Sequence, residues 1–159
     1  MSITLGVVMD PIETIKPYKD TSLALMLAAQ KRGWQLFYMQ QKDLYLEQGQ
    51  ARARGHLVTV ADDNDHWFEL GEQEDRDLGS LNVILMRKDP PFDNEFIYST
   101  YILEAAERLG TLIVNKPSSL RDCNEKVFAT QFPQCCPPVL VSRSDRQLRE
   151  FHQQHGDVI

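Results

Sequence analysis

The chain has 159 residues, a formal net charge of −6 and a mean hydropathy of −0.39, with 42% hydrophobic and 25% charged residues. This balance is typical of a globular domain with its own core. No stretch approaches the roughly 20 apolar residues of a membrane helix, and the N-terminus lacks the basic start of a signal peptide. The acidic balance argues against general nucleic-acid binding. We therefore expect a cytoplasmic protein with no nucleic-acid or membrane partner.

The first elements form a strand, a helix and a second strand. Residues 3–9 (ITLGVVM) are almost wholly apolar, as in a strand that is covered on both faces. Asp20 or Thr21 then caps a Leu- and Ala-rich helix, and Gly33 stands where such a helix ends. Residues 34–39 (WQLFYM) predict the second strand. A right-handed, parallel crossover is strongly favoured for such a unit.

Residues 43–79 have a different character. Short alternating stretches around Gly49 predict a hairpin or meander. The following segment, residues 63–80 (DNDHWFELGEQEDRDLGS), is acidic and predicted to be mostly solvated, with Trp67 and Phe68 anchored in the core. We interpret the whole section as an insertion over the sheet.

The alternation of strands and helices then resumes. We predict strands over residues 81–87, 111–115 and 139–142, helical turns from Pro117, and a helix from Ser144 or Asp145. Asp93 caps a further helix that ends at Gly110; its predicted core-facing residues are Phe96, Ile97, Thr100, Tyr101 and Leu103 to Ala105. Residues 157–159 begin an apolar strand that stops at once, so we expect the front part of a longer protein. The fold class is α/β, with a mainly parallel sheet.

Cysteine and histidine give no metal site. Cys123, Cys135 and Cys136 form no C-x-x-C motif and have no histidine at zinc spacing. We expect reduced thiols and predict no metal ligands. His152 and His155 share one helix face, and we interpret them as a solvated pair.

Polar residues follow three predicted strands at the point where each strand ends. Asp10 follows the first strand, Arg87-Lys88-Asp89 the strand at residues 81–87, and Asn115-Lys116 the strand after that. If these strands are parallel, the residues share one edge of the sheet, where ligands bind in open α/β folds. Pro90 and Pro91 stiffen the middle loop, which favours a site for a small anion over simple solvated strand exits.

One alternative is a receiver-like module. Asp10, Asp89 and Lys116 would then be an acid, a phosphoacceptor and a lysine on successive strand ends. Against it, the first strand ends in one acid where a Mg²⁺ site would need two, and the meander has no place in that fold. No Walker A motif, dinucleotide fingerprint, G-x-S-x-G or H-E-x-x-H is present.

Several stretches resemble the N-terminal part of bacterial glutathione synthetases. They are GVVMDPI, YKDTS, DLYLEQGQARAR, ILMRKDPPFDNEFIYSTYILE and GTLIVNKPSSLRDCNEKVF. The resemblance implies a Rossmann-like pre-ATP-grasp domain with a meander insertion over residues 1–116, and the truncated start of an ATP-grasp domain over residues 117–159. It also implies an ATP-dependent ligase that joins γ-glutamylcysteine to glycine through an acyl phosphate.

The same resemblance implies roles for four residues. Asp10, Lys19 and Arg87 fall on stretches that bind γ-glutamylcysteine, and Lys126 matches a lysine that binds ATP phosphates. The resemblance implies Mg²⁺ or Mn²⁺ with ATP, and a homo-oligomer, for the whole enzyme. It places no catalytic residue and no metal ligand within this chain. We therefore expect the chain alone to be inactive, to hold no cofactor and to bind ATP weakly or not at all.

Overall fold

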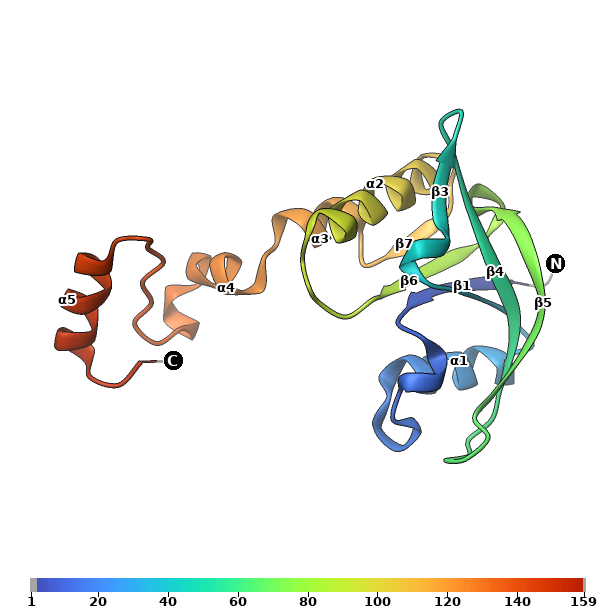
Figure 1. The fold of residues 1–159 in the computed structure, drawn as a ribbon, viewed down its shortest axis with the longest axis horizontal. Coiled ribbons are helices and arrows are strands. Elements are labelled where there is room, and N and C mark those ends of the chain that lie inside the picture. The colour runs from blue at the N-terminus through green and yellow to red at the C-terminus, as the bar shows by residue number, and fades with distance from the viewer. Residues whose placement is uncertain (1–2, 159) are drawn as a thin grey trace. The chain divides into compact units, whose positions relative to one another are not determined.

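A computed structural model describes residues 3–158 and divides the chain into two compact units, Met1–Arg121 and Asp122–Ile159. The first unit holds all seven strands of one sheet (Figure 1). The strands are β1 (Thr4–Met9), β2 (Gln35–Met39), β3 (Leu44–Glu47), β4 (Gln50–Val60), β5 (Phe68–Asp77), β6 (Val83–Arg87) and β7 (Leu112–Val114).

The helices are distributed over both units. The first unit contains α1 (Thr21–Lys31), α2 (Asn94–Arg108) and α3 (Pro117–Asp122), the last of which reaches the boundary between the units. The second unit contains α4 (Glu125–Phe128) and α5 (Asp145–His155). Short 3₁₀ turns lie at Ile12–Thr14, Pro17–Lys19, Gln41–Asp43, Leu78–Ser80, Ala129–Gln131 and Pro133–Cys135.

The sheet is mixed. Its strand order is β3-β4-β2-β1-β6-β7, with β5 paired to β4. The pairs β1–β2, β1–β6 and β6–β7 are parallel, and the pairs made by β4 with β2, β3 and β5 are antiparallel. The prediction of a mainly parallel sheet is therefore wrong for the part that β3, β4 and β5 form. The predicted parallel crossover from β1 through α1 to β2 is confirmed.

The meander also lies elsewhere than predicted. It continues the sheet beside β2 and does not form an insertion over it, because β4 pairs with β2 through Phe37↔Leu57 and Tyr38↔His56. The acidic segment forms strand β5, whose side chains are mostly exposed. An edge strand tolerates acidic residues, since much of its surface faces water. The anchoring by Trp67 and Phe68 is confirmed, and the Trp67 Nε1–H donates to the Ile12 carbonyl at 3.0 Å.

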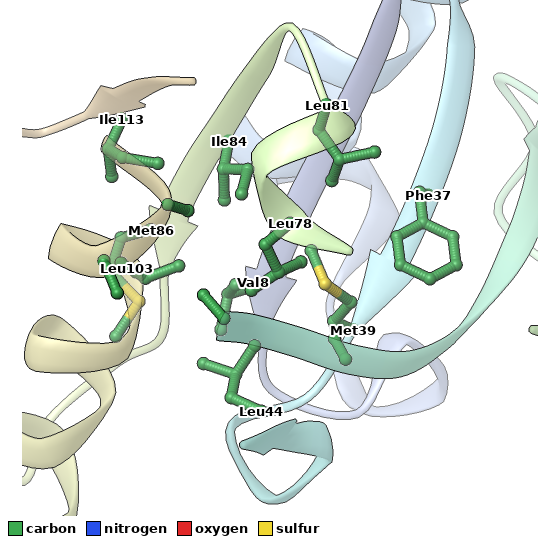
Figure 2. Close-up of a cluster of buried hydrophobic side chains, with 14 of the residues drawn as sticks. Val8, Phe37, Met39, Leu44, Leu78, Leu81, Ile84, Met86, Leu103 and Ile113 are labelled. Carbon is green, nitrogen blue, oxygen red and sulfur yellow. The ribbon is translucent and has the colours of Figure 1, made fainter. Parts of the chain in front are cut away.

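Two apolar cores lie on opposite faces of the sheet. Side chains of a strand alternate between its faces, so Val7 and Met9 join the core that contains α1, whereas Val8 joins the core that contains α2. Figure 2 shows the core that contains α2, in which Val8, Ile84 and Met86 of the sheet cluster with Leu103 of α2. Each fully buried Val, Leu, Ile or Met stabilises the fold by about 1.5–3 kcal/mol. Helices on both faces therefore enclose the parallel part of the sheet.

The helix ends follow the expected capping chemistry. The Asp20 carboxylate accepts a hydrogen bond from the Leu23 amide at 2.8 Å, and the Asp93 carboxylate accepts one from the Phe96 amide at 2.9 Å. Gly33 and Gly110, at the ends of α1 and α2, have φ values of 77° and 106°. The predicted starts and stops of both helices are confirmed, because these residue types satisfy terminal backbone groups and tolerate positive φ.

Three further predictions are wrong. Residues 139–142 form no strand in the described chain, because no other strand of the second unit is available for pairing. Val158 is not in a strand, and Ile159 lies outside the described residues. Tyr101 is 47% exposed and does not join the core; the Arg121 guanidinium lies 4.6 Å from its ring centroid.

Candidate functional site

The carboxyl ends of β1, β6 and β7 lie side by side at one edge of the sheet. Met9 is in register with Arg87, and Leu85 with Val114. Asp10, Arg87 and Asn115 therefore stand at neighbouring strand ends, as the sequence predicts. We call this edge the rim, and we define it by Asp10, residues 87–89 and residues 115–116.

Asp10 already interacts with two residues that follow β6. Its carboxylate lies 3.0 Å from Lys88 Nζ and accepts a hydrogen bond from the Asp89 amide at 3.1 Å. The Lys88 side chain is only 16% exposed. Asp10 thus ties the loop after β6 to the end of β1, which leaves less of its carboxylate for a ligand amine.

Arg87 has a different environment. Its Nε–H donates to the Ser22 hydroxyl at 3.1 Å, and Ser22 lies buried in the first turn of α1. Within residues 3–158, Arg87 has no acidic partner, and no hydrogen bond or ion pair involves its two Nη groups. A guanidinium with both Nη groups available fits a carboxylate through two parallel hydrogen bonds.

The side chains of Asp10 and Arg87 lie on opposite faces of the sheet. Arg87 continues the alternation of Val83 and Leu85, whose side chains belong to the α1-side core, and it contacts α1 itself. Asp10 lines a cavity together with residues of α2. The described structure therefore brings the two residues to one rim without bringing their charged groups into contact.

The cavity beside Asp10 has a volume of about 470 Å³. Its polar lining comes from three strand ends and α2, and it includes Asp10, Gln41, Lys42, Lys88, Glu95 and Tyr98. The Gln41 Nε2 atom is buried and has no hydrogen-bond partner in the described chain. Sequence reasoning missed Gln41 and Lys42, although the polar run "QQKD" after the buried strand β2 is the same signal as at the other strand ends.

Tyr38 supports the backbone below the rim. Its hydroxyl accepts a hydrogen bond from the Ile12 amide at 3.1 Å, in the turn that follows β1. Burial raises the pKa of the Tyr38 hydroxyl above its ordinary value. The group therefore stays neutral over the physiological range and serves as a structural partner for the turn.

The two remaining candidates are exposed lysines. Lys19 ends the 3₁₀ turn just before α1 and forms no ion pair with the described residues. Lys126 lies in α4, where Asn124 caps the helix by accepting hydrogen bonds from the Lys126 and Val127 amides at 3.0 and 3.3 Å. Lys126 belongs to the second unit, whereas the residues of the rim belong to the first.

Residues 3–158 contain neither a metal-binding cluster nor a membrane-spanning helix. No group of three or more His, Cys, Asp or Glu side chains among them is arranged to hold a metal ion. No helix in this part of the chain has both the length and the apolar character needed to span a bilayer.

Comparison with known proteins gives consistent matches along the whole chain. The sequence model of the prokaryotic glutathione synthetase N-terminal domain matches residues 3–121, and that of the ATP-grasp domain of the same enzymes matches residues 125–159. The glutathione synthetases of Pseudomonas syringae and Pseudomonas putida are 65% and 62% identical to the chain over 159 residues. That of Yersinia pestis is 59% identical over 157 residues.

These alignments cover 99–100% of this chain but only 49–50% of each relative. The chain thus spans about half the length of the curated relatives that it matches. The family model for the N-terminal domain alone covers most of the chain, including every strand of the sheet and the rim. The chain belongs to the prokaryotic glutathione synthetase family.

Proposed function

We propose that this chain supplies the N-terminal half of a cytoplasmic, homo-oligomeric glutathione synthetase. The reaction joins γ-L-glutamyl-L-cysteine to glycine, with ATP phosphorylating the cysteinyl carboxylate before the glycine amine attacks. In this proposal residues 1–116 form a pre-ATP-grasp domain whose parallel strands and helices are Rossmann-like, and residues 117–159 begin the ATP-grasp domain. Family membership supports the assignment, and the environment of Arg87 supports the location of the peptide site.

The single observation that carries the peptide site is an arginine without a counter-ion. Arg87 stands at the rim with Nε held by Ser22 and with no acidic partner among residues 3–158. The dipeptide carries carboxylates, which suit this free guanidinium. Lys19, just before α1, adds positive charge for the same ligand. Asp10 acts on this peptide chiefly by holding the loop after β6, and it offers its partly exposed carboxylate to the peptide amine.

We further propose that Lys126 binds phosphate oxygens of ATP. The lysine is exposed on α4 and available for such a contact. ATP would supply the phosphoryl group that activates the carboxylate. The described residues do not fit a Mg²⁺ or Mn²⁺ site, because no suitable cluster of ligands exists among them. We therefore assign the metal ligands to the half of the relatives that this chain does not span.

Three observations argue against the alternative of a receiver-like module. The Asp89 amide donates to Asp10, which makes this segment a structural tie between two strands. The antiparallel strands β3 to β5 continue the sheet where a receiver domain would have none of them. Family membership accounts for the same residues without a phosphoacceptor.

The test uses the full-length protein that the gene encodes, with and without Arg87→Ala. The unaltered protein should release ADP only when both γ-glutamylcysteine and glycine are present. Arg87→Ala should raise the KM for the dipeptide roughly 10- to 100-fold, since a lost charge-assisted hydrogen bond costs about 1.5–3 kcal/mol. The KM values for ATP and glycine should change little.

Arg108→Ala is the matched control, because Arg108 is an exposed arginine in the last turn of α2, away from the rim. It should leave all three KM values unchanged. If Arg87→Ala also leaves the dipeptide KM unchanged, Arg87 is not part of the peptide site. If the unaltered protein shows no dipeptide-dependent ADP release, the proposed function itself is wrong.

A further inference from the structure

A buried hydroxyl on α1 contacts the arginine of the proposed peptide site. The Ser22 hydroxyl accepts a hydrogen bond from Arg87 Nε at 3.1 Å, across 65 residues of sequence. Ser22 is only 5% exposed, whereas Arg87 is exposed. We propose that Ser22 is a positioning residue that fixes the orientation of the Arg87 guanidinium for a peptide carboxylate. This inference rests on the proposed function.

The Arg87 guanidinium needs such a partner because no other described residue forms a hydrogen bond or an ion pair with it. An arginine side chain has several rotatable bonds, so ordering it costs conformational entropy. Within the described chain no carboxylate pairs with Arg87, so no ion pair limits its rotamers. Binding a carboxylate through two hydrogen bonds requires a defined plane of the guanidinium. A hydrogen bond at Nε restricts that plane and leaves both Nη groups for the ligand.

Ser22 is itself held rigidly. It follows the first residue of α1, and the Asp20 carboxylate caps this turn through the Leu23 amide at 2.8 Å. Leu23 and Met26, which are 2% and 0% exposed, anchor the same turn in the α1-side core. The hydroxyl position is therefore fixed by helix geometry and packing, and it does not depend on a mobile loop.

Asp10 and Ser22 hold different groups at the rim. Asp10 holds the backbone of the loop after β6 through the Asp89 amide, and Ser22 holds the side chain that precedes this loop. The contacts come from opposite faces of the sheet, so removal of one leaves the other in place. A variant at Ser22 thus changes the orientation of Arg87 without releasing the loop.

The experiment measures steady-state kinetics of the full-length protein with Ser22→Ala. The dipeptide KM should rise about tenfold, which corresponds to one lost hydrogen bond to a charged group, while kcat should stay close to its original value. Ser22→Thr keeps a hydroxyl and should restore the original KM. In an Arg87→Ala background, Ser22→Ala should have no further effect on KM, because there is no guanidinium left to position.

Thr111→Val is the control for the loss of a buried hydroxyl. Thr111 is 2% exposed and donates to the Leu78 carbonyl at 2.8 Å, at the other end of the β-strands from the rim. Thermal unfolding should show that both variants lose some stability, and only Ser22→Ala should change the dipeptide KM.

The outcomes distinguish a failure of the positioning role of Ser22 from a failure of the proposed function. If Arg87→Ala raises the dipeptide KM and Ser22→Ala does not, Ser22 has no positioning role and the proposed function stands. Effects of the two variants that simply add would also overturn the inference, because they would show independent action. If the unaltered protein makes no glutathione, both proposals fail.

Discussion

At the residue scale, the sequence predicts where a polar side chain stands more reliably than which groups it contacts. Asp10 and Arg87 lie at the predicted strand ends, because the apolar runs before them fix the strands. The partners of Asp10 are Lys88 and the Asp89 amide, and the latter is 79 residues away in sequence. Such a contact depends on which strands become neighbours and on which face each side chain occupies. Neither can be deduced from local sequence.

The same limit applies to Ser22 and Gln41. Ser22 has the pattern of an ordinary first-turn residue of a helix, and its contact with Arg87 exists only after α1 has packed on the sheet. Gln41 lies in a polar run that resembles a solvated strand exit, yet its Nε2 atom is buried beside the cavity. Conversely, the caps Asp20 and Asp93 were predictable, since their partners are three residues away.

The Asp75 carboxylate should make stability depend on pH. The Tyr45 hydroxyl donates to it at 2.5 Å and Arg52 binds it at 2.8 Å, and these contacts hold the pKa of Asp75 below its ordinary value. A group whose pKa is lowered by folding stabilises the fold above its unfolded pKa of about 3.9 and loses this contribution as pH falls through the folded value. Asp75→Asn should therefore lower the urea midpoint at pH 7.

The check is a series of urea titrations of both proteins from neutral to acidic pH. The difference between their midpoints should shrink once the pH falls below about 4, because the original carboxyl then becomes protonated. Asp62→Asn, at an exposed position outside the strands, is the control and should show no comparable difference. A difference for Asp75→Asn that stays constant with pH would rule out the ionised carboxylate as its cause.

At the element scale, the sequence predicts elements that carry their own signals and misses elements that depend on a neighbour. α1 and α2 have capping residues, a terminal glycine and an apolar stripe. β5 has none of the usual alternation and exists because β4 offers it a long pairing edge. Residues 139–142 have the composition of a strand but find no partner in the described part of the second unit. Pairing, which is non-local, decides both cases.

One side chain of α1 should stabilise the end of β4. Gln30 Nε2 donates to the Val60 carbonyl at 2.7 Å, and the Val60 amide donates to Gln30 Oε1 at 2.9 Å. The side-chain amide of Gln30 thus satisfies both backbone groups of Val60, as a paired strand would. Gln30→Ala should cost about 1–3 kcal/mol of unfolding free energy, since two partly buried backbone groups lose their partners. Hydrogen exchange at the Val60 amide should become faster.

Lys31→Ala is a suitable control, because Lys31 is the exposed neighbour of Gln30 in α1 and alanine favours helix. It should leave exchange at Val60 unchanged. Unaltered exchange in Gln30→Ala would mean that the amide of Val60 is protected by other means.

At the scale of the whole molecule, the two units differ in their cores. The first unit contains both apolar cores, whereas no residue from 122 to 158 is buried. The apolar side chains of the second unit include Val127, Phe132 and Val141, which are 52%, 46% and 65% exposed. An isolated helix of the length of α5 is only marginally stable in water. The second unit therefore has little packing energy of its own within the described chain.

Limited proteolysis of the 159-residue chain should reveal this difference. The first cuts should fall within residues 122–158 and leave a resistant product that contains residues 3–121. A version ending at Arg121 should melt at nearly the same temperature as the whole chain, because no residue from 122 to 158 is itself buried. Early cleavage within the sheet or in α2 would contradict the higher stability of the first unit, and a much lower melting temperature of the shortened version would show that the first unit depends on the second.

Strand β5 also limits how copies of this protein meet. Among the described strands it pairs only with β4, so its outer backbone groups are open to another strand. It carries Glu69 and Glu72, which form no ion pair with the described residues, and the chain as a whole is acidic. A second copy that approached this edge would bring like charges together as the two strands tried to pair. Copies should therefore resist fibre-like growth through β5, and a functional assembly would need to form through a different surface.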